Sequence, residues 1–189
     1  MDPLWSNLFR RQGQPQDSLL DAVRQVPIFQ DLAPRHLRQL RAILHRRAYS
    51  DGEAVVREGE VGSGMFVIAS GRVRITQSQE DGGEHELAEL GPGDFFGEQA
   101  LLDATPRTAS ATAVGRCELV GFFRPDLLNL IENNPRRGLQ IVLRLAQIVA
   151  VRLRHTNRLL QEARRRLSQA ETRQTDHEPL PASGPENEP

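Results

Sequence analysis

The fold is decided by GDFFGEQALL at residues 93–102, which is followed by DATPRTAS at residues 103–110. Gly93 and Gly97 flank a pair of aromatic residues, and Glu98 then begins a short run of residues that favour a helix. The first turn of a helix leaves backbone N–H groups unpaired, and its dipole favours an anion. The stretch therefore predicts a glycine turn and a short helix that can receive a phosphate.

Arg107 enters a strand whose following residues, 109–111, are small, so a ligand has room beside it. The planar guanidinium can hold two phosphate oxygens. The ionised carboxylate of Glu98 only accepts hydrogen bonds, which suits a ribose hydroxyl. We expect the barrel to leave this guanidinium unpaired until a ligand binds. The alternative is a Glu98–Arg107 salt bridge with no ligand, but an ion pair alone does not require the glycines, the helix start and the small residues together.

Two motifs resemble the phosphate-binding cassette of the cyclic nucleotide-binding domain family: Phe96-Gly97-Glu98-x-Ala100-Leu101, and Pro106-Arg107-Thr108-Ala109-Ser110. The resemblance continues upstream through residues 55–59 and 65–75 and covers about residues 25–165. It implies an α+β, mainly β fold: an eight-stranded jelly-roll β-barrel flanked by helices, with a long C-terminal dimerisation helix. The implied ligand is cAMP or cGMP, with no cofactor and no metal.

The resemblance also implies roles for single residues. Glu98 would accept the ribose 2′-hydroxyl, Arg107 would pair with the cyclic phosphate, and the amide of Ala100 would donate to a phosphate oxygen. Thr108 is placed as in cGMP-dependent kinases, where the hydroxyl can favour guanine; it can equally bind phosphate when the base is adenine. The predicted ligand-binding residues are Phe96, Gly97, Glu98, Gln99, Ala100, Arg107, Thr108, Ser110, Thr156 and Asn157.

Short β-rich runs separated by glycines fill the sequence between about residues 48 and 123. They are residues 54–58, 65–70, 72–77, 86–90, 109–114 and 118–123. Many short strands joined by glycine turns predict a closed sandwich or jelly roll rather than a parallel sheet. Residues 19–49 before them have a helical pattern, in which Leu37, Leu40 and Leu44 share one face.

A long helix is predicted over residues 136–170. Its small and apolar residues alternate spacings of four and three from Val142 to Ala170, as in the seam of a coiled coil, which predicts a homodimer. Thr156 interrupts this seam and either sets the register or contacts something polar. Residues 152–157 resemble the dimer helix of catabolite activator (Crp/Fnr-like) proteins, where a threonine followed by a serine reaches adenine; Asn157 replaces the serine here.

Four segments are expected along the chain. Residues 1–20 form a short helix and linker, 21–135 the nucleotide-binding barrel with its helices, 136–170 the coiled-coil helix, and 171–189 a disordered acidic tail. The apolar stripe that includes Trp5 and Phe9 either packs back on the domain or acts as a docking peptide or weak membrane-surface anchor.

Composition narrows the function classes. The single cysteine excludes an internal disulfide, and there is neither a zinc-like Cys/His cluster nor a run of about 18 apolar residues to span a membrane, so we expect a cytoplasmic protein. No base and nucleophile are paired with an oxyanion site, so we do not expect an enzyme.

We expect a cyclic nucleotide-binding regulator that signals through its C-terminal helix to a partner protein. The alternatives are a Crp-like transcription regulator that contacts DNA and a ligand-free coiled-coil adaptor. DNA binding is not expected, because the net charge is −1 and the long helix leads into an acidic tail rather than a recognition helix.

Overall fold

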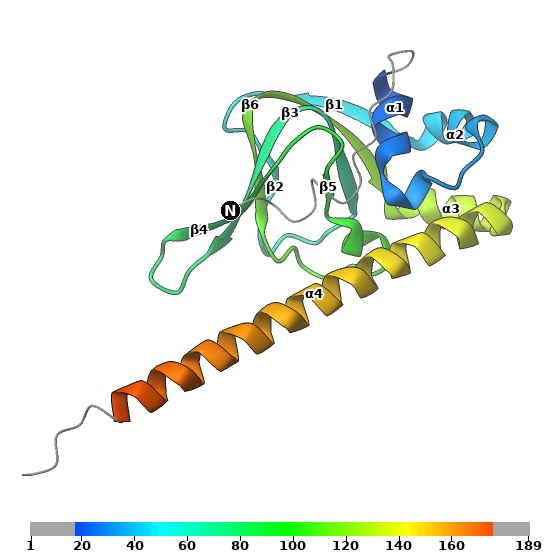
Figure 1. Ribbon diagram of the computed structural model, residues 1–189. Coiled ribbons are helices and arrows are strands. Elements are labelled where there is room, and N and C mark those ends of the chain that lie inside the picture. Colours follow the sequence, from blue (N-terminus) through cyan, green and yellow to red (C-terminus); the bar gives the residue numbers. More distant parts are fainter. Residues whose placement is uncertain (1–17, 176–189) are drawn as a thin grey trace, which may run out of the picture. The chain divides into compact units, whose positions relative to one another are not determined.

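The computed structural model describes residues 18–175 (Figure 1). The chain divides into two compact units, one up to Ile148 and one from Val149 onward. The first unit holds every strand and most of the helices, and the second continues the last helix, α4 (Pro135–Thr175). Most of the predicted N-terminal segment, including Trp5, and most of the predicted tail lie outside the described residues.

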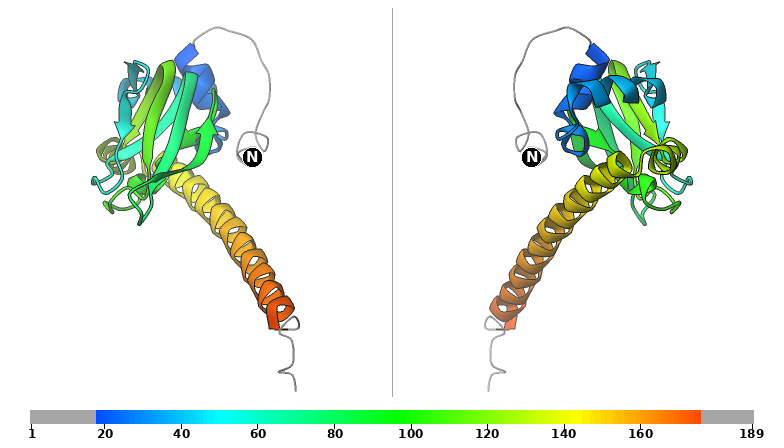
Figure 2. Two further views of the ribbon diagram at one scale, coloured as in Figure 1. Left: turned by 90° about the vertical axis from the view of Figure 1, so that its left-hand side faces the viewer. Right: turned by 90° about the vertical axis from the view of Figure 1, so that its right-hand side faces the viewer.

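Short helices gather at one end of the β structure in the first unit (Figures 1 and 2). They are α1 (Ser18–Gln25), η1 (Pro27–Phe29), α2 (Pro34–Leu40), η2 (Arg41–Ile43) and α3 (Arg124–Asn133). Pro27 and Pro34 begin their helices because proline has a φ angle suited to the first helical position and needs no N–H partner there. The helical pattern was predicted to run to Tyr49, but a strand begins at His45.

The strands form one antiparallel sheet of six, in the order β1-β6-β3-β4, with β2 paired to β6 and β5 paired to β3. Their bounds are β1 His45–Tyr49, β2 Ala54–Val56, β3 Gly64–Ser78, β4 Glu84–Leu90, β5 Phe95–Phe96 and β6 Ser110–Phe123. The mainly antiparallel β fold with flanking helices is thus confirmed. Eight strands and closure of the barrel are not confirmed, since β3 and β6 each join two of the runs predicted as separate strands.

The two long strands bend where their pairing shifts register around Ser70. Gly71 lies at this point with a φ of 82°, in the left-handed region, and a Cβ atom added there would lie 2.3 Å from the Cβ of Cys117. Only glycine fits both the backbone angle and the space. This residue therefore lets β3 continue past the point where its pairing with β6 shifts register.

Replacing Gly71 by alanine is expected to lower the free energy of unfolding by about 3 kcal/mol, because the positive φ costs about 1–2 kcal/mol and the clash with Cys117 adds to it. Gly115→Ala is the matched control, since Gly115 also has a positive φ, of 69°, but nothing lies within 4 Å of its added Cβ. Denaturant unfolding of both variants measures the difference. Equal losses would show that the close contact with Cys117 is not what requires glycine.

Two apolar clusters lie on opposite faces of β3 and β6. Met65 and Val67 of β3 face the helices together with Val120 and Phe122, whereas their neighbours Phe66 and Ile68 face the second cluster together with Leu119. Successive side chains of a strand point to opposite faces, so one strand can serve both clusters. Phe96 belongs to the second cluster, which fixes the turn that follows it.

The predicted long helix is present as α4, which is continuous from Pro135 to Thr175. Several of its large apolar side chains are exposed: Leu139, Leu143, Val151, Leu153, Leu159 and Leu160. Across the described part of the chain, the helices are too short or too polar to cross a lipid bilayer.

Candidate functional site

The predicted glycine turn lies directly after β5. Gly97 has a φ of 75° in the left-handed region and begins the short helix η3 (Glu98–Leu101). A Cβ at this position would lie 2.5 Å from Nη1 of Arg107, so the turn needs glycine for its backbone angle and for its neighbour. The turn and the short helix expected from the sequence are both confirmed.

Arg107 is held by backbone pairing with residues 59–62, outside the named strands. Its N–H donates to the carbonyl of Glu60 at 2.8 Å, and the N–H of Gly59 donates to the carbonyl of Arg107 at 2.9 Å. Pro106 pairs with Val61 in an isolated bridge. Two loops far apart in the sequence thus fix the direction in which the arginine leaves the backbone.

The guanidinium of Arg107 points inward and is hydrogen-bonded. Nη2 donates to the carbonyl of Gly64 at 2.7 Å, and Nη1 donates to the carbonyl of Gly97 at 3.2 Å. The expectation of an unpaired guanidinium is therefore wrong. Both acceptors are neutral, and an anion would be a stronger partner because charge-assisted hydrogen bonds are about twice as strong as neutral ones.

Glu98 supplies a fully buried carboxyl group at the first position of η3. Burial lowers the pKa of the Arg107 guanidinium, and the negative charges of Glu98 and Glu60 act in the opposite direction. Arginine stays protonated under these conditions because its ordinary pKa is so high. The site therefore places a half-buried cation close to a buried acid.

Two further glycines belong to the site, although the sequence indicated only turns for them: Gly62 lies in the loop before β3, and Gly64 is the first residue of β3. Gly64 supplies the carbonyl that receives Arg107. A Cβ on Gly62 would lie 2.7 Å from the Cβ of Ala100 and 3.1 Å from Cζ of Arg107. The close spacing of these glycines at the start of a strand is the signal in the sequence that could have drawn attention to them.

Other predicted site residues already have partners within the first unit. The N–H of Ala100 donates to the carbonyl of Gly97 at 3.1 Å, and the ring of Phe96 stacks on Phe66 with centroids 5.5 Å apart. Gln99 is exposed. Ala100 would have to exchange its bond with Gly97 to reach a phosphate, and Phe96 acts here as a core residue.

The strand side of the site carries the two predicted hydroxyl residues. The hydroxyl oxygen of Ser110 accepts the N–H of Glu58 at 3.0 Å. Thr108 is exposed, and its carbonyl accepts a hydrogen bond from the side chain of Gln77 at 3.2 Å. Thr108 therefore lies at the surface, and its contact with a ligand stays a prediction.

Thr156 and Asn157 lie on α4, in the second unit, and both are exposed. Their contribution to ligand binding stays a prediction. The structure brings together Gly97, Glu98, Ala100 and Arg107, and the described residues contain no group of three His, Cys, Asp or Glu side chains that could hold a metal ion. The site therefore offers a positively charged hydrogen-bond donor, Arg107, near a carboxyl group, that of Glu98.

Comparison with known proteins gives one matching family model, described as "Cyclic nucleotide-binding domain", over residues 46–134. The Cyclic AMP receptor protein of Thermus thermophilus is 38% identical over 149 residues, which are 76% of this chain and 67% of that protein. A cGMP-dependent protein kinase of Drosophila melanogaster is 42% identical over 91 residues, which are 48% of this chain and 10% of the kinase.

Among solved structures, the Catabolite Activator Protein of Thermus thermophilus matches with a TM-score of 0.66 and 38% identity. The match covers 73% of this chain and 63% of that chain. The present chain thus spans about two thirds of the length of these bacterial relatives.

Proposed function

Since the chain belongs to the cyclic nucleotide-binding domain family, we propose that it is a regulatory protein that binds cAMP or cGMP through Arg107 and Glu98. One observation carries the proposal: a half-buried arginine lies against the Gly97 turn with only neutral carbonyls as its hydrogen-bond partners, and a fully buried carboxylate acts on it. A phosphate would replace those carbonyls and form charge-assisted bonds instead.

The charges around Arg107 favour a cyclic phosphate over an open one. Glu98 and Glu60 both act on this guanidinium, so the site balances one positive charge against two nearby carboxylates. A cyclic phosphodiester carries one negative charge, whereas a phosphate monoester carries about 1.5 to 2 near neutral pH. The additional charge of a 5′-mononucleotide would be repelled by these carboxylates.

The base of the bound nucleotide is either adenine or guanine. Relatives named for cyclic AMP and for cGMP are both similar to this chain. The exposed Thr108 could donate its hydroxyl to guanine or to the phosphate, and Thr156 and Asn157 could reach the base from α4. The Thr108, Thr156 and Asn157 contacts are therefore part of the proposal.

Isothermal titration of the full chain with cAMP, cGMP and 5′-AMP tests this function. We expect one or both cyclic nucleotides to bind with a Kd in the micromolar range or tighter, and 5′-AMP at least about tenfold more weakly. Absence of heat with both cyclic nucleotides at concentrations of about 1 mM would contradict the proposal, and equal binding of 5′-AMP would contradict the charge argument.

We propose that the chain forms a homodimer through α4. This helix would transmit the effect of nucleotide binding to a partner protein. The exposed Leu153 and Leu160 belong to the predicted seam and need an apolar partner, which a second copy would supply. A ligand shifts such an equilibrium only by the difference in its affinity for the two states. Sedimentation equilibrium with and without nucleotide measures the assembly, and a monomer in both conditions would exclude signalling through a homodimer.

We also propose a cytoplasmic location, consistent with a ligand made inside the cell.

Contact with DNA is the second candidate, because the compared relatives include a Catabolite Activator Protein and this chain spans 63% of that one. The exposed arginines of α4, including Arg154 and Arg158, would contact phosphates. A salt-dependent mobility shift on duplex DNA would support this function. The third possibility, a ligand-free coiled-coil adaptor, would require that Arg107 variants keep full activity in cells.

A further inference from the structure

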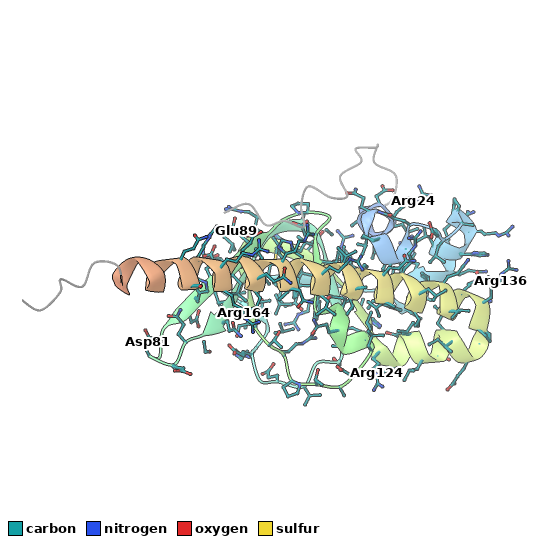
Figure 3. The ribbon with its side chains drawn as sticks, turned by 60° about the horizontal axis from the view of Figure 1, so that its bottom comes forward. Arg24, Asp81, Glu89, Arg124, Arg136 and Arg164 are labelled. Carbon is teal, nitrogen blue, oxygen red and sulfur yellow. The ribbon has the colours of Figure 1, made fainter. Side chains whose placement is uncertain are left out.

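A second cationic site lies in the first unit, among the flanking helices. A cavity of about 430 Å³ lies between the segment leading into α2 and the beginning of α4. Arg35 and His36 line it from α2, and Arg136 and Arg137 line it from α4, with Asn134 at the junction. Figure 3 marks Arg136 at the beginning of α4.

The positive charge of this cavity is not balanced by acids. Asp31 is the carboxylate in the lining, and its oxygen is bound by Arg144. Among residues 18–175, Arg35, Arg136 and Arg137 form no ion pair. Arg137 donates to the side chain of Gln39, and Arg35 donates to the ring of His36 at 3.3 Å. Three arginines therefore line one cavity whose single lining carboxylate, Asp31, is bound by a fourth arginine, Arg144.

Arginines on the strands are arranged differently, because many of them bind carboxylates. The pairs are Arg46–Glu118, Arg47–Glu53, Arg72–Glu89 and Arg74–Glu86. Carboxylates thus neutralise these four strand arginines, whereas the three arginines of the helical cavity have no such partner among residues 18–175. The pKa of His36 in this cavity is lowered, first by burial and then by the positive charges of Arg137 and Arg35.

We propose that this cavity is a second anion site, separate from Arg107, that binds a small phosphate-bearing ion. Guanidinium groups match phosphate oxygens in pairs, and three of them suit a ligand with more than one phosphate. The volume falls within the range of small-ligand sites, about 300–1,000 Å³, but the lining offers few apolar groups for a sugar or a base. Pyrophosphate is therefore a better model for the ligand than a nucleoside.

The test is isothermal titration of the full chain with pyrophosphate and with inorganic phosphate at constant ionic strength. The double variant Arg35→Gln/Arg136→Gln should weaken pyrophosphate binding at least about tenfold, because charged hydrogen bonds are lost. The double variant Arg46→Gln/Arg72→Gln removes the same charge from the strand surface and should change the affinity by less than about twofold, since exposed pairs contribute little. Arg107→Gln should leave pyrophosphate binding unchanged.

A local signal accompanies the titration. The ring resonances of His36 should shift on addition of pyrophosphate in the wild type and in Arg107→Gln, but not in Arg35→Gln/Arg136→Gln. The proposal is overturned if neither phosphate nor pyrophosphate binds at about 10 mM, well above the range of specific affinities. It is also overturned if both double variants lose affinity for pyrophosphate equally, or if Arg107→Gln alone abolishes pyrophosphate binding. Tighter binding of a polyglutamate peptide than of pyrophosphate would overturn it too, because that result would indicate docking of an acidic protein segment.

Discussion

Replacing Arg107 by glutamine is expected to weaken cyclic nucleotide binding by about a hundredfold or more. Two charge-assisted hydrogen bonds to the phosphate, worth about 1.5–3 kcal/mol each, would be lost. The neutral amide of glutamine can still donate to the carbonyl of Gly64 or Gly97, so the fold should survive. Titration calorimetry measures the affinity, and circular dichroism checks the fold.

The matched control for this substitution is Arg72→Gln. Arg72 is exposed and paired with Glu89, so its loss removes the same charge without touching the site. We expect nucleotide affinity within about twofold of the wild type for this variant, as for other exposed pairs. If Arg107→Gln bound nucleotide as tightly as Arg72→Gln, the arginine would have a purely structural role.

Replacing Glu98 by glutamine should remove the preference for ribose over 2′-deoxyribose. In the wild type, the buried carboxylate would accept the 2′-hydroxyl in a charged hydrogen bond, so cAMP should bind about tenfold or more tightly than 2′-deoxy-cAMP. A neutral amide of the same shape accepts a weaker bond. We therefore expect a loss of about tenfold for cAMP and almost none for the deoxy analogue.

The variant Glu60→Gln is the control for this experiment. It distinguishes direct contact of a carboxylate with the ribose from the effect of a nearby negative charge. Glu60 also acts on the charge of Arg107, but its side chain is exposed and belongs to the loop before β3. This control should keep the preference for ribose. If Glu98→Gln retained the wild-type ratio of cAMP to 2′-deoxy-cAMP affinities, the carboxylate would not contact the sugar.

The parts of the site that follow from local sequence were predictable. The glycine at residue 97 and the acid after it specify a left-handed turn and a short helix, and both are found. The small residues after Arg107 indicated a strand, and β6 begins at Ser110, three residues after the arginine; the room for a ligand beside it stays a prediction. Backbone geometry that depends on residue type alone can be inferred from one sequence.

The parts that depend on distant backbone atoms were not predictable. The acceptors of Arg107 are carbonyl groups of Gly64 and Gly97, and carbonyl groups have no signature in the sequence. For the same reason Gly62 was taken as a turn residue, although it faces Ala100 and Arg107 across the loops. The arginine was expected to be unpaired because only side-chain partners can be counted from a sequence.

The fold shows the same division between local and long-range information. Residues 45–49 lay in the segment predicted as helical. Their sequence, HRRAY, has no alternation of apolar and polar residues to mark a strand, and only Tyr49 of β1 is buried. The strand exists because it pairs with residues 117–121 of β6, about seventy positions later. Runs 65–70 and 72–77 were separated at Gly71, where the structure bends one strand instead of ending it.

The central claim is that a cyclic nucleotide takes Arg107 away from its carbonyl partners. A crystal structure of the full chain with bound cyclic nucleotide tests it most directly. We expect phosphate oxygens within hydrogen-bonding distance of the Arg107 guanidinium, about 2.7–3.2 Å, and the ribose 2′-hydroxyl at the carboxylate of Glu98. A nucleotide bound elsewhere, with Arg107 still donating only to Gly64 and Gly97, would contradict the account.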